Sequence, residues 1–359
     1  MKVSIYDVLR FNKESKSNIS KILPGILVFL FVALPIYTGG NQARPAPTPQ
    51  EPEALVHQVT EPQEDLRVGV FRGPTAVGLS RSISQGVALP NGGVVEFELV
   101  GAPDVMVARI VNREVDLAVL PINLAARLHT AGQPLALVAV TGMGMLSVVS
   151  SDPAIVDLAS LQGTVIHSAG QGATPDYVFR SILLHHQMQN GRDLEIDFTL
   201  AYPEITASLI AGRITTALLP EPFATMATTQ NPGVRRVIDI QELWAQIPGN
   251  PPDFPMTALV ARTDILDRLP KSTQVFLDSY RDSLQWIKAN PQEAGVLTAQ
   301  LDLGIPGPVA TSSIPRSAFG FWPASDPATK SMVESLLERF VQIDPASIGG
   351  RLPGPEFYR

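Results

Sequence analysis

The chain contains no cysteine among its 359 residues, and this absence excludes several kinds of chemistry at once. Disulfides, thiolate metal sites, iron–sulfur clusters and a cysteine nucleophile all need the side chain that is missing. Histidine is scarce as well, with five residues, none spaced like a metal-ligand pair. His185 and His186 are neighbours and would point in different directions on a helix. We therefore predict no metal site and no cofactor.

Motifs of covalent and acid–base catalysis are also missing. No serine stands in a G-x-S-x-G elbow, and no two carboxylates stand out as an acid and a base. The net charge is -7, with acidic and basic residues interspersed, so there is no basic stripe for a phosphate backbone. The sequence thus predicts a protein that is not an enzyme and does not bind nucleic acid.

Residues 1–40 have the pattern of a signal peptide or signal anchor, with basic residues before an apolar run at 22–37. A relaxed membrane span needs ~20 apolar residues, and the run is shorter. Its cleavage pattern is poor, so cleaved and retained forms both stay open. Residues 41–63 are rich in Pro, Gln and Glu and predict a semi-rigid linker. We expect an exported protein, periplasmic or otherwise extracytoplasmic, with or without a retained N-terminal anchor.

The rest of the chain carries one pattern twice. Residues 66–83 match residues 165–182 at an offset of 99, which places Thr75 on Thr174 and Arg81 on Arg180. Any two β-α-β segments share a hydrophobic pattern, but here the proline and threonine positions agree as well. The strands 96–99 and 195–198 follow at the same offset of 99. The helix starts Pro103 and Pro203 and the strands 115–120 and 215–219 then match at an offset of 100.

This duplication predicts an α/β protein of two similar lobes, each built on a mainly parallel sheet. We place the first lobe at 64–145 and 258–359 and the second at 146–257. The extended runs 141–150 and 255–262 would be two crossovers between the lobes and a hinge. Helices at 271–290 and 328–341 should pack on the first lobe. Because such sheets bind ligands beyond the carboxyl ends of their strands, a ligand cleft is expected at the interface.

The turn at 168–177 is the strongest local signal. A strand ends near Ser168, two glycines allow a sharp turn, Thr174 is a good N-cap and Pro175 fits the first helical position. The resulting helix N-terminus suits a carboxylate, sulfonate, phosphate or ring acceptor. The alternative is an ordinary glycine-rich turn between a strand and a helix, which is common in α/β proteins and binds no ligand.

Three side chains at other strand ends have two interpretations each. Arg72 can offer a fork of donors to an anionic group or be a solvated charge. Glu221, between two prolines, can accept from an amino group or ring N–H, or cap the next helix. Phe223 can cover an aromatic ligand or belong to the core.

Several segments together resemble the substrate-binding proteins of ABC importers in the nitrate/sulfonate/taurine and NMT1/THI5-like superfamily. The resemblance covers about residues 66–359 and is carried by Gly73-Pro-Thr75, Gly170–Tyr177, Leu219–Phe223, Ile314-Pro315 and the tail 347–358. It implies a type II periplasmic-binding fold, closure about two crossovers, a small-molecule ligand, delivery to a membrane permease and a monomer. The ligand-binding residues that it implies are Arg72, Gly73, Pro74, Thr75, Asn123, Gln171, Gly172, Ala173, Thr174, Glu221 and Phe223.

The sequence departs from this superfamily in two ways. The cysteine that carries a lipid in many relatives is absent after the signal, and so is the cysteine-rich motif of related pyrimidine synthases. The expected ligand is a heterocyclic vitamin precursor or a sulfonate-like molecule. Two alternatives remain, an enzyme on the same fold such as a menaquinone-precursor dehydratase, and a membrane-tethered ligand sensor.

Overall fold

The structure, a computed structural model, describes residues 61–359. The signal segment predicted for 1–40 and most of the linker predicted for 41–63 lie outside the described residues. Between residues 61 and 359, no helix combines the length and apolar character that crossing a membrane requires.

The first of two sheets has six strands in the order β11-β4-β10-β3-β1-β2. β1 pairs in parallel with β2 and β3, whereas β10 runs antiparallel to β3 and β4. Every residue of β4 is buried, as its continuous apolar sequence requires. The strands are β1 (Leu66–Phe71), β2 (Val95–Val100), β3 (Leu117–Pro121), β4 (Leu135–Met143), β10 (Pro255–Arg262) and β11 (Phe319–Pro323).

The second sheet has five strands in the order β7-β6-β8-β5-β9. β6 pairs in parallel with β7 and β8, and β5 runs antiparallel to β8 and β9. The strands are β5 (Leu146–Ser150), β6 (Val165–His167), β7 (Glu195–Asp197), β8 (Thr216–Pro220) and β9 (Arg235–Asp239).

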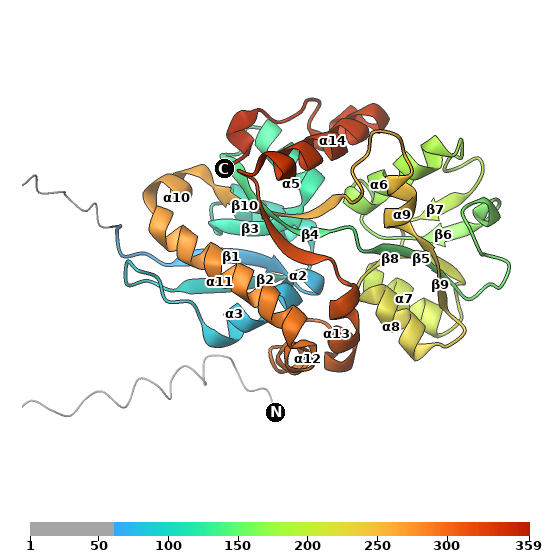
Figure 1. The fold of residues 1–359 in the computed structure, drawn as a ribbon, viewed down its shortest axis with the longest axis horizontal. Helices are drawn as coiled ribbons and strands as arrows, with labels where there is room; N and C mark the ends of the chain where they lie inside the picture. Colours follow the sequence, from blue (N-terminus) through green and yellow to red (C-terminus); the bar gives the residue numbers. More distant parts are fainter. Residues whose placement is uncertain (1–60) are drawn as a thin grey trace, which may run out of the picture. The chain divides into compact units, whose positions relative to one another are not determined.

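Helices cover both sheets (Figure 1). Those before β4 are α2 (Pro74–Gly78), α3 (Ser80–Gln85), α4 (Pro103–Val111) and α5 (Ile122–Thr130). Those between β6 and β10 are α6 (Thr174–His185), α7 (Tyr202–Ile210), α8 (Phe223–Gln230) and α9 (Ile240–Ala245). Those after β10 are α10 (Thr263–Arg268), α11 (Pro270–Ala289), α12 (Pro291–Gln300), α13 (Gly307–Ser313) and α14 (Pro327–Ile343). Short 3-10 turns are η1 (Ala159–Leu161), η2 (Ile314–Arg316), η3 (Pro345–Ile348) and η4 (Pro355–Phe357).

The duplicated pattern of the sequence is present in both sheets. β1, β2 and β3 form a parallel trio, and β6, β7 and β8 form a second trio with the same connections through helices. The expectation of mainly parallel sheets is wrong, because both sheets are mixed. β5 and β10 enter their sheets from the side of the other lobe, where the trio strands end, and so they must run antiparallel to them.

The two crossovers between the lobes touch each other. The first is the short link between β4 and β5, and the second joins α9 to β10. Asp253 Oδ1 accepts from the N–H of Gly144 at 3.1 Å and of Phe254 at 2.8 Å, so one carboxylate joins both crossovers. A Cβ at Gly144 would lie 2.7 Å from Asp253 Oδ1, which explains glycine at this close approach.

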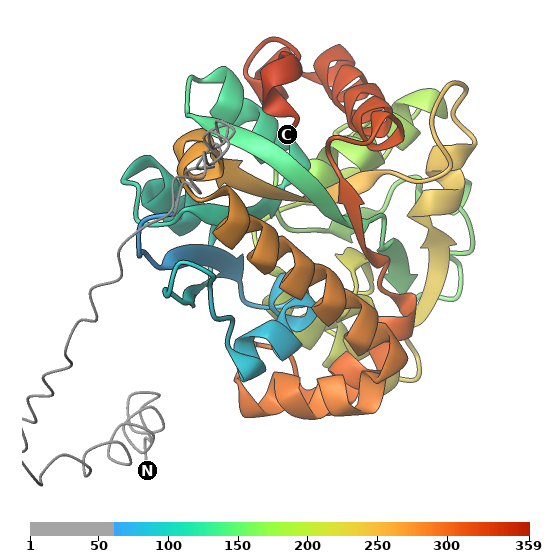
Figure 2. The same ribbon diagram turned by 60° about the vertical axis from the view of Figure 1, so that its left-hand side comes forward.

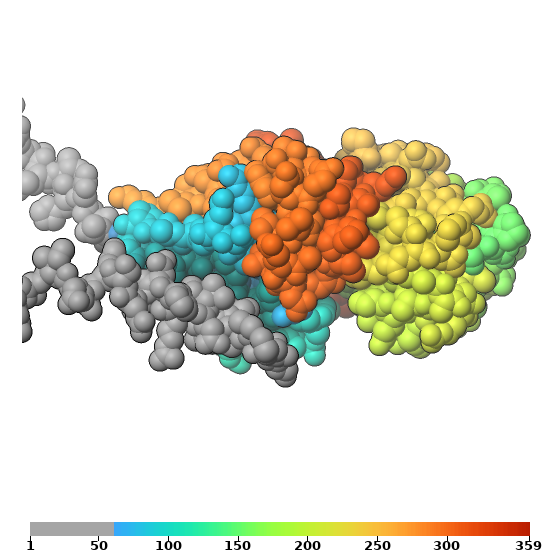
Figure 3. Space-filling model, turned by 90° about the horizontal axis from the view of Figure 1, so that it is seen from below, coloured from blue at the N-terminus to red at the C-terminus, as the bar shows by residue number. Residues whose placement is uncertain are grey.

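Helix α11 packs on the first lobe as predicted, against α3 and β11, and Figure 2 shows it running across that sheet. Helix α14 differs from the expectation because it also packs against α6 of the second lobe. There the Tyr177 hydroxyl donates to Asp344 Oδ2 at 2.8 Å, and the Tyr177 and Phe340 rings lie 5.2 Å apart. A further contact joins α13 to α8, where the orange and yellow surfaces meet in Figure 3.

Candidate ligand-binding cavity between the lobes

A cavity of about 620 Å³ lies between the two sheets at the carboxyl ends of their strands. The ends of β1 and β3 contribute Phe71 and Leu120, and the ends of β6 and β8 contribute Ala169 and Pro220. Helices α4, α6 and α7 all begin at this cavity. The position agrees with the rule that open α/β sheets bind ligands beyond the carboxyl ends of their strands.

Aromatic side chains from both lobes make much of the wall. Tyr202 and Phe223 stack on each other with their ring centroids 5.5 Å apart and an interplanar angle of 23°. The Tyr202 hydroxyl donates to the carbonyl of Ala169 at 3.1 Å, and burial raises the pKa of this tyrosine. The stacking and this hydrogen bond hold both rings in place in the cavity wall. The aromatic residues of the wall are Phe71, Phe198, Tyr202, Phe223, Tyr280 and Phe319.

Two charged residues line the cavity within the described part of the chain, and each already has a protein partner. Arg72 is exposed at the rim, where its Nη1 donates to the Asp302 carbonyl at 2.5 Å and lies 3.5 Å from Asp302 Oδ2. Glu221 is 4% exposed and forms an ion pair with Arg236, while its Oε2 accepts from the N–H of Thr225 at 3.2 Å. Each carboxylate oxygen accepts more than one hydrogen bond, so Glu221 keeps acceptor capacity.

The glycine turn before α6 forms as predicted, but its helix begins differently. The N-cap is Ala173 rather than Thr174, and the Thr174 hydroxyl donates to Asn123 Oδ1 at 3.1 Å instead of capping the helix. The N–H of Gly172 donates to Asp176 Oδ2 at 2.8 Å. Burial raises the pKa of Asp176, which also pairs with Arg180. One backbone N–H of the turn, that of Gly172, is thus already bonded to a carboxylate of α6 and is not available to a ligand.

Prolines further reduce the donors available at the cavity. Pro74, Pro103, Pro175 and Pro203 stand in the first turns of α2, α4, α6 and α7, and all four line the cavity. A proline has no N–H, so each of these helix starts offers one backbone donor fewer to an anion.

The predicted ligand-binding residues divide into two groups. Seven line the cavity, namely Arg72, Pro74, Thr75, Ala173, Thr174, Glu221 and Phe223. Four do not, namely Gly73, Asn123, Gln171 and Gly172. Direct contact of either group with a ligand stays a prediction.

Asn123 forms hydrogen bonds between the two lobes. It is 1% exposed, and its Nδ2 donates to the carbonyl of Gly172 at 2.8 Å while its Oδ1 accepts from Thr174. Asn123 lies in the first turn of α5 in the first lobe, whereas Gly172 lies in the turn before α6 and Thr174 is the first residue of α6 in the second lobe. Its amide therefore joins the lobes beside the cavity.

The cavity also contains residues that the sequence analysis did not single out as site residues. Thr141 lies in β4 and Tyr280 in α11, at 2% and 1% exposure. Burial raises the pKa of Tyr280 to about 12, and its hydroxyl lies beside that of Thr141. The two hydroxyls do not reach hydrogen-bond geometry, and Thr141 Oγ1 has no partner among the described residues. A polar residue inside the apolar run of β4 was the one available sequence signal.

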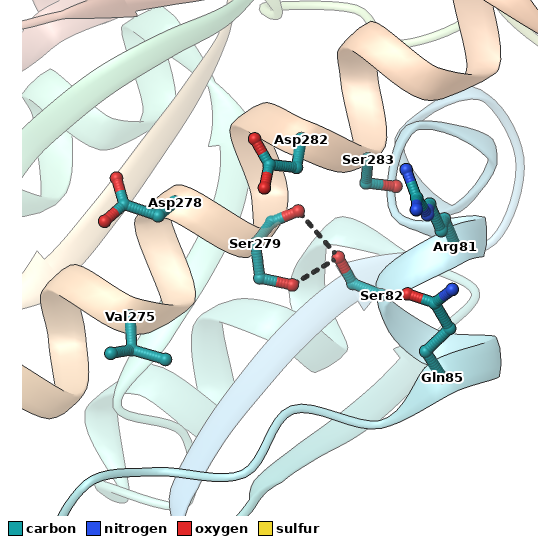
Figure 4. A pocket seen from close by; sticks show the side chains of 8 residues that line it. All are labelled: Arg81, Ser82, Gln85, Val275, Asp278, Ser279, Asp282 and Ser283. Carbon is teal, nitrogen blue, oxygen red and sulfur yellow. Dashed lines mark hydrogen bonds between the residues drawn. The ribbon is translucent and has the colours of Figure 1, made fainter.

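A smaller hollow of about 320 Å³ lies between α3 and α11 (Figure 4). The Ser82 hydroxyl closes its base with hydrogen bonds to the Ser279 hydroxyl at 2.9 Å and the Ser279 carbonyl at 3.0 Å. Asp278 at its edge already pairs with Arg281 at 2.8 Å. This hollow is a groove between two packed helices. Across residues 61–359 no cluster of His, Asp or Glu could hold a metal ion.

Comparison with known proteins agrees with this architecture. The family model described as the NMT1-like family matches residues 60–301. The chain belongs to the NMT1-like family. Among curated proteins, no sequence matches this member of the family.

Solved structures share the fold. An ABC transporter from Parabacteroides distasonis is 26% identical with a TM-score of 0.70, covering 82% of this chain and 98% of that one. The periplasmic aliphatic sulphonate binding protein of Escherichia coli is 16% identical with a TM-score of 0.64, covering 81% and 92%. The periplasmic nitrate-binding protein of Synechocystis is 16% identical with a TM-score of 0.62, covering 79% and 83%. This NMT1-like protein therefore has the two-lobed type II periplasmic-binding fold, with its two crossovers.

Proposed function

We propose that this chain is the substrate-binding component of an ABC importer, which captures a small organic molecule between its lobes and delivers it to a permease. The observation that carries the proposal is the cavity of about 620 Å³ lined by matching strand ends of both lobes. Its volume fits a small molecule, since ligand pockets span about 300–1,000 Å³. Membership of the NMT1-like family and the likeness to named transporter proteins support the same role.

The lining favours an uncharged or weakly charged ring over an oxyanion. Six aromatic residues surround the space, Arg72 at the rim is already paired, and four helix starts carry prolines that lack a donor. Glu221, although it is paired with Arg236, keeps acceptor capacity for a ring N–H or an amino group. We therefore propose a donor-bearing heterocycle, although the structural relatives are named for aliphatic sulphonate and nitrate.

The proposal includes a location and a partner. An importer subunit of this fold works outside the cytoplasm as a monomer and docks on a membrane permease. The basic and apolar N-terminal segment supports export. The mass of the mature protein from its own host tests this part, because removal of the first forty residues gives a free protein and their retention gives a tethered one.

A thermal-shift screen tests the binding function. Cytosine represents donor-bearing heterocycles, and taurine and nitrate represent anions. A binder at one hundred times its Kd stabilises the folded state by about 2.7 kcal/mol, which raises the unfolding midpoint by several degrees. We expect this shift with cytosine and not with the two anions.

A matched pair of variants then locates the binding. Phe223→Leu removes one ring of the stacked wall, whereas Phe97→Leu changes a partly buried ring of β2 that lies outside the cavity and pairs with Phe276. We expect Phe223→Leu to weaken cytosine binding about tenfold and Phe97→Leu to leave it unchanged. A heterocycle-binding function is contradicted if taurine or nitrate stabilises the protein and cytosine does not.

A further inference from the structure

Five threonines line the cavity, and Thr141 is the one among them whose hydroxyl is both buried and without a hydrogen-bond partner among the described residues. Thr75 donates its hydroxyl to the Phe71 carbonyl at 2.7 Å, and Thr174 donates to Asn123 at 3.1 Å. Thr141 is 2% exposed, and its Oγ1 has no hydrogen-bond partner among the described residues. It also lines the cavity from β4, the strand next to the edge strand β11 of the first-lobe sheet.

A buried hydroxyl without a partner destabilises the folded state, because it has lost its hydrogen bonds to water. Valine has nearly the same shape as threonine and would fill this strand position without that loss. The hydroxyl recovers a partner when a molecule in the cavity presents a polar atom to it. Its placement is therefore suited to ligand recognition rather than to folding.

We propose that the Thr141 hydroxyl is a specificity-determining contact, which binds a polar atom on the edge of a ring held in the cavity. This inference rests on the proposed function. Glu221, on the second lobe, accepts from a donor of the same ring, and the stacked pair of Tyr202 and Phe223 contacts its apolar face. The ligand class is then an uncharged heterocycle with polar atoms on two edges.

The first test needs no ligand. Thr141→Val removes the unpartnered hydroxyl, and we expect it to raise the unfolding midpoint of the ligand-free protein by about 2–4 °C. Thr273→Val is the matched control, since Thr273 is also 2% exposed and its Oγ1 also lacks a partner among residues 61–359, but it lies outside the cavity. A midpoint lowered by Thr141→Val shows that the hydroxyl serves the fold, and this result overturns the inference.

The second test uses cytosine as the probe in isothermal titration calorimetry. We expect Thr141→Val to raise the Kd for cytosine about tenfold, which corresponds to one lost hydrogen bond. Thr141→Ser keeps the hydroxyl and should stay within about threefold of the wild type, and Thr273→Val should not change the Kd. Wild-type affinity in Thr141→Val overturns the inference.

Different results would contradict the proposed function and the role of Thr141. If cytosine, taurine and nitrate all leave the wild-type protein unshifted, the result counts against the proposed function. The ligand-free midpoint of Thr141→Val still decides whether the hydroxyl is dispensable for folding. If taurine or nitrate binds and Thr141→Val does not weaken it, the specificity role of Thr141 is wrong.

Discussion

Asp253 joins the two crossovers through a single carboxylate oxygen. Replacing it by Ala or by Asn separates the effect of its hydrogen bonds from the effect of its charge. Asp253→Ala leaves the N–H groups of Gly144 and Phe254 without their acceptor. We expect it to lower the free energy of unfolding by about 1–3 kcal/mol. Asp253→Asn keeps an oxygen at this position and should be at least as stable as the wild type at pH 7. Denaturant unfolding of both variants measures the difference, and equal losses would contradict it.

The pH dependence of the same residue has a defined sign. Burial raises the pKa of Asp253 above its ordinary value of 3.8. The folded state then binds the proton more tightly than the unfolded state, so this group lowers stability as the pH rises from 3.8 through the folded-state pKa. Asn does not titrate. The stability of Asp253→Asn relative to the wild type should therefore be greatest at pH 7 and vanish as the pH falls below 3.8; a difference independent of pH would refute this origin.

At the scale of elements, Asn123 fastens the start of α5 to the turn before α6. Asn123→Ala removes hydrogen bonds to Gly172 and Thr174 and leaves these groups buried without a partner. We expect a loss of about 1–3 kcal/mol in unfolding free energy. Asn112→Ala is the control, because Asn112 is exposed just after α4 and its side-chain amide donates to Glu114 at 3.3 Å; its effect should stay within about 0.5 kcal/mol. Similar values for the two variants would contradict the joining role of Asn123.

Helices α12 and α13 approach each other through glycine. A Cβ at Gly295 would lie 2.6 Å from the carbonyl oxygen of Gly307, which is backbone and cannot rotate away. Gly295→Ala should therefore push the two helices apart. We expect it to lower the free energy of unfolding by about 1–3 kcal/mol and the unfolding midpoint with it. Val296→Ala, at a side chain 56% exposed on the same helix, should have little effect. Thermal unfolding measures both variants. An unchanged unfolding midpoint in Gly295→Ala would contradict the prediction, because it would show that the backbone contact between α12 and α13 can widen without loss of stability.

Elements with local signals were predictable from the sequence. The glycine turn, the proline helix starts and the two long helices follow from φ preferences, missing N–H groups and apolar periodicity. The N-cap of α6 was misplaced by one residue because the Thr174 hydroxyl is drawn to Asn123, 51 positions away in the chain. Likewise, Asp176 occupies a turn N–H that the sequence analysis assigned to a ligand. Such long-range competition has no local sequence signal.

At the scale of the whole molecule, the duplication predicted two lobes and a cleft between them, and both sheets have the predicted trio of parallel strands. Strand direction at the crossovers was not predictable from hydrophobic pattern, since an apolar run reads the same in either direction. The second attachment of α14, to α6, was missed for a related reason. Its apolar face is evident in the sequence, but the partner of that face is set by the tertiary fold.

The central claim is that one small molecule binds between the lobes, against the stacked rings and the Thr141 hydroxyl. A crystal structure of the protein with the strongest binder of the screen tests it most directly. We expect density for one molecule in the cavity, its ring on Tyr202 and Phe223 and a polar atom within hydrogen-bond distance of Thr141 Oγ1. A saturated crystal with an empty cavity closed over, or with the molecule bound elsewhere, would contradict the account.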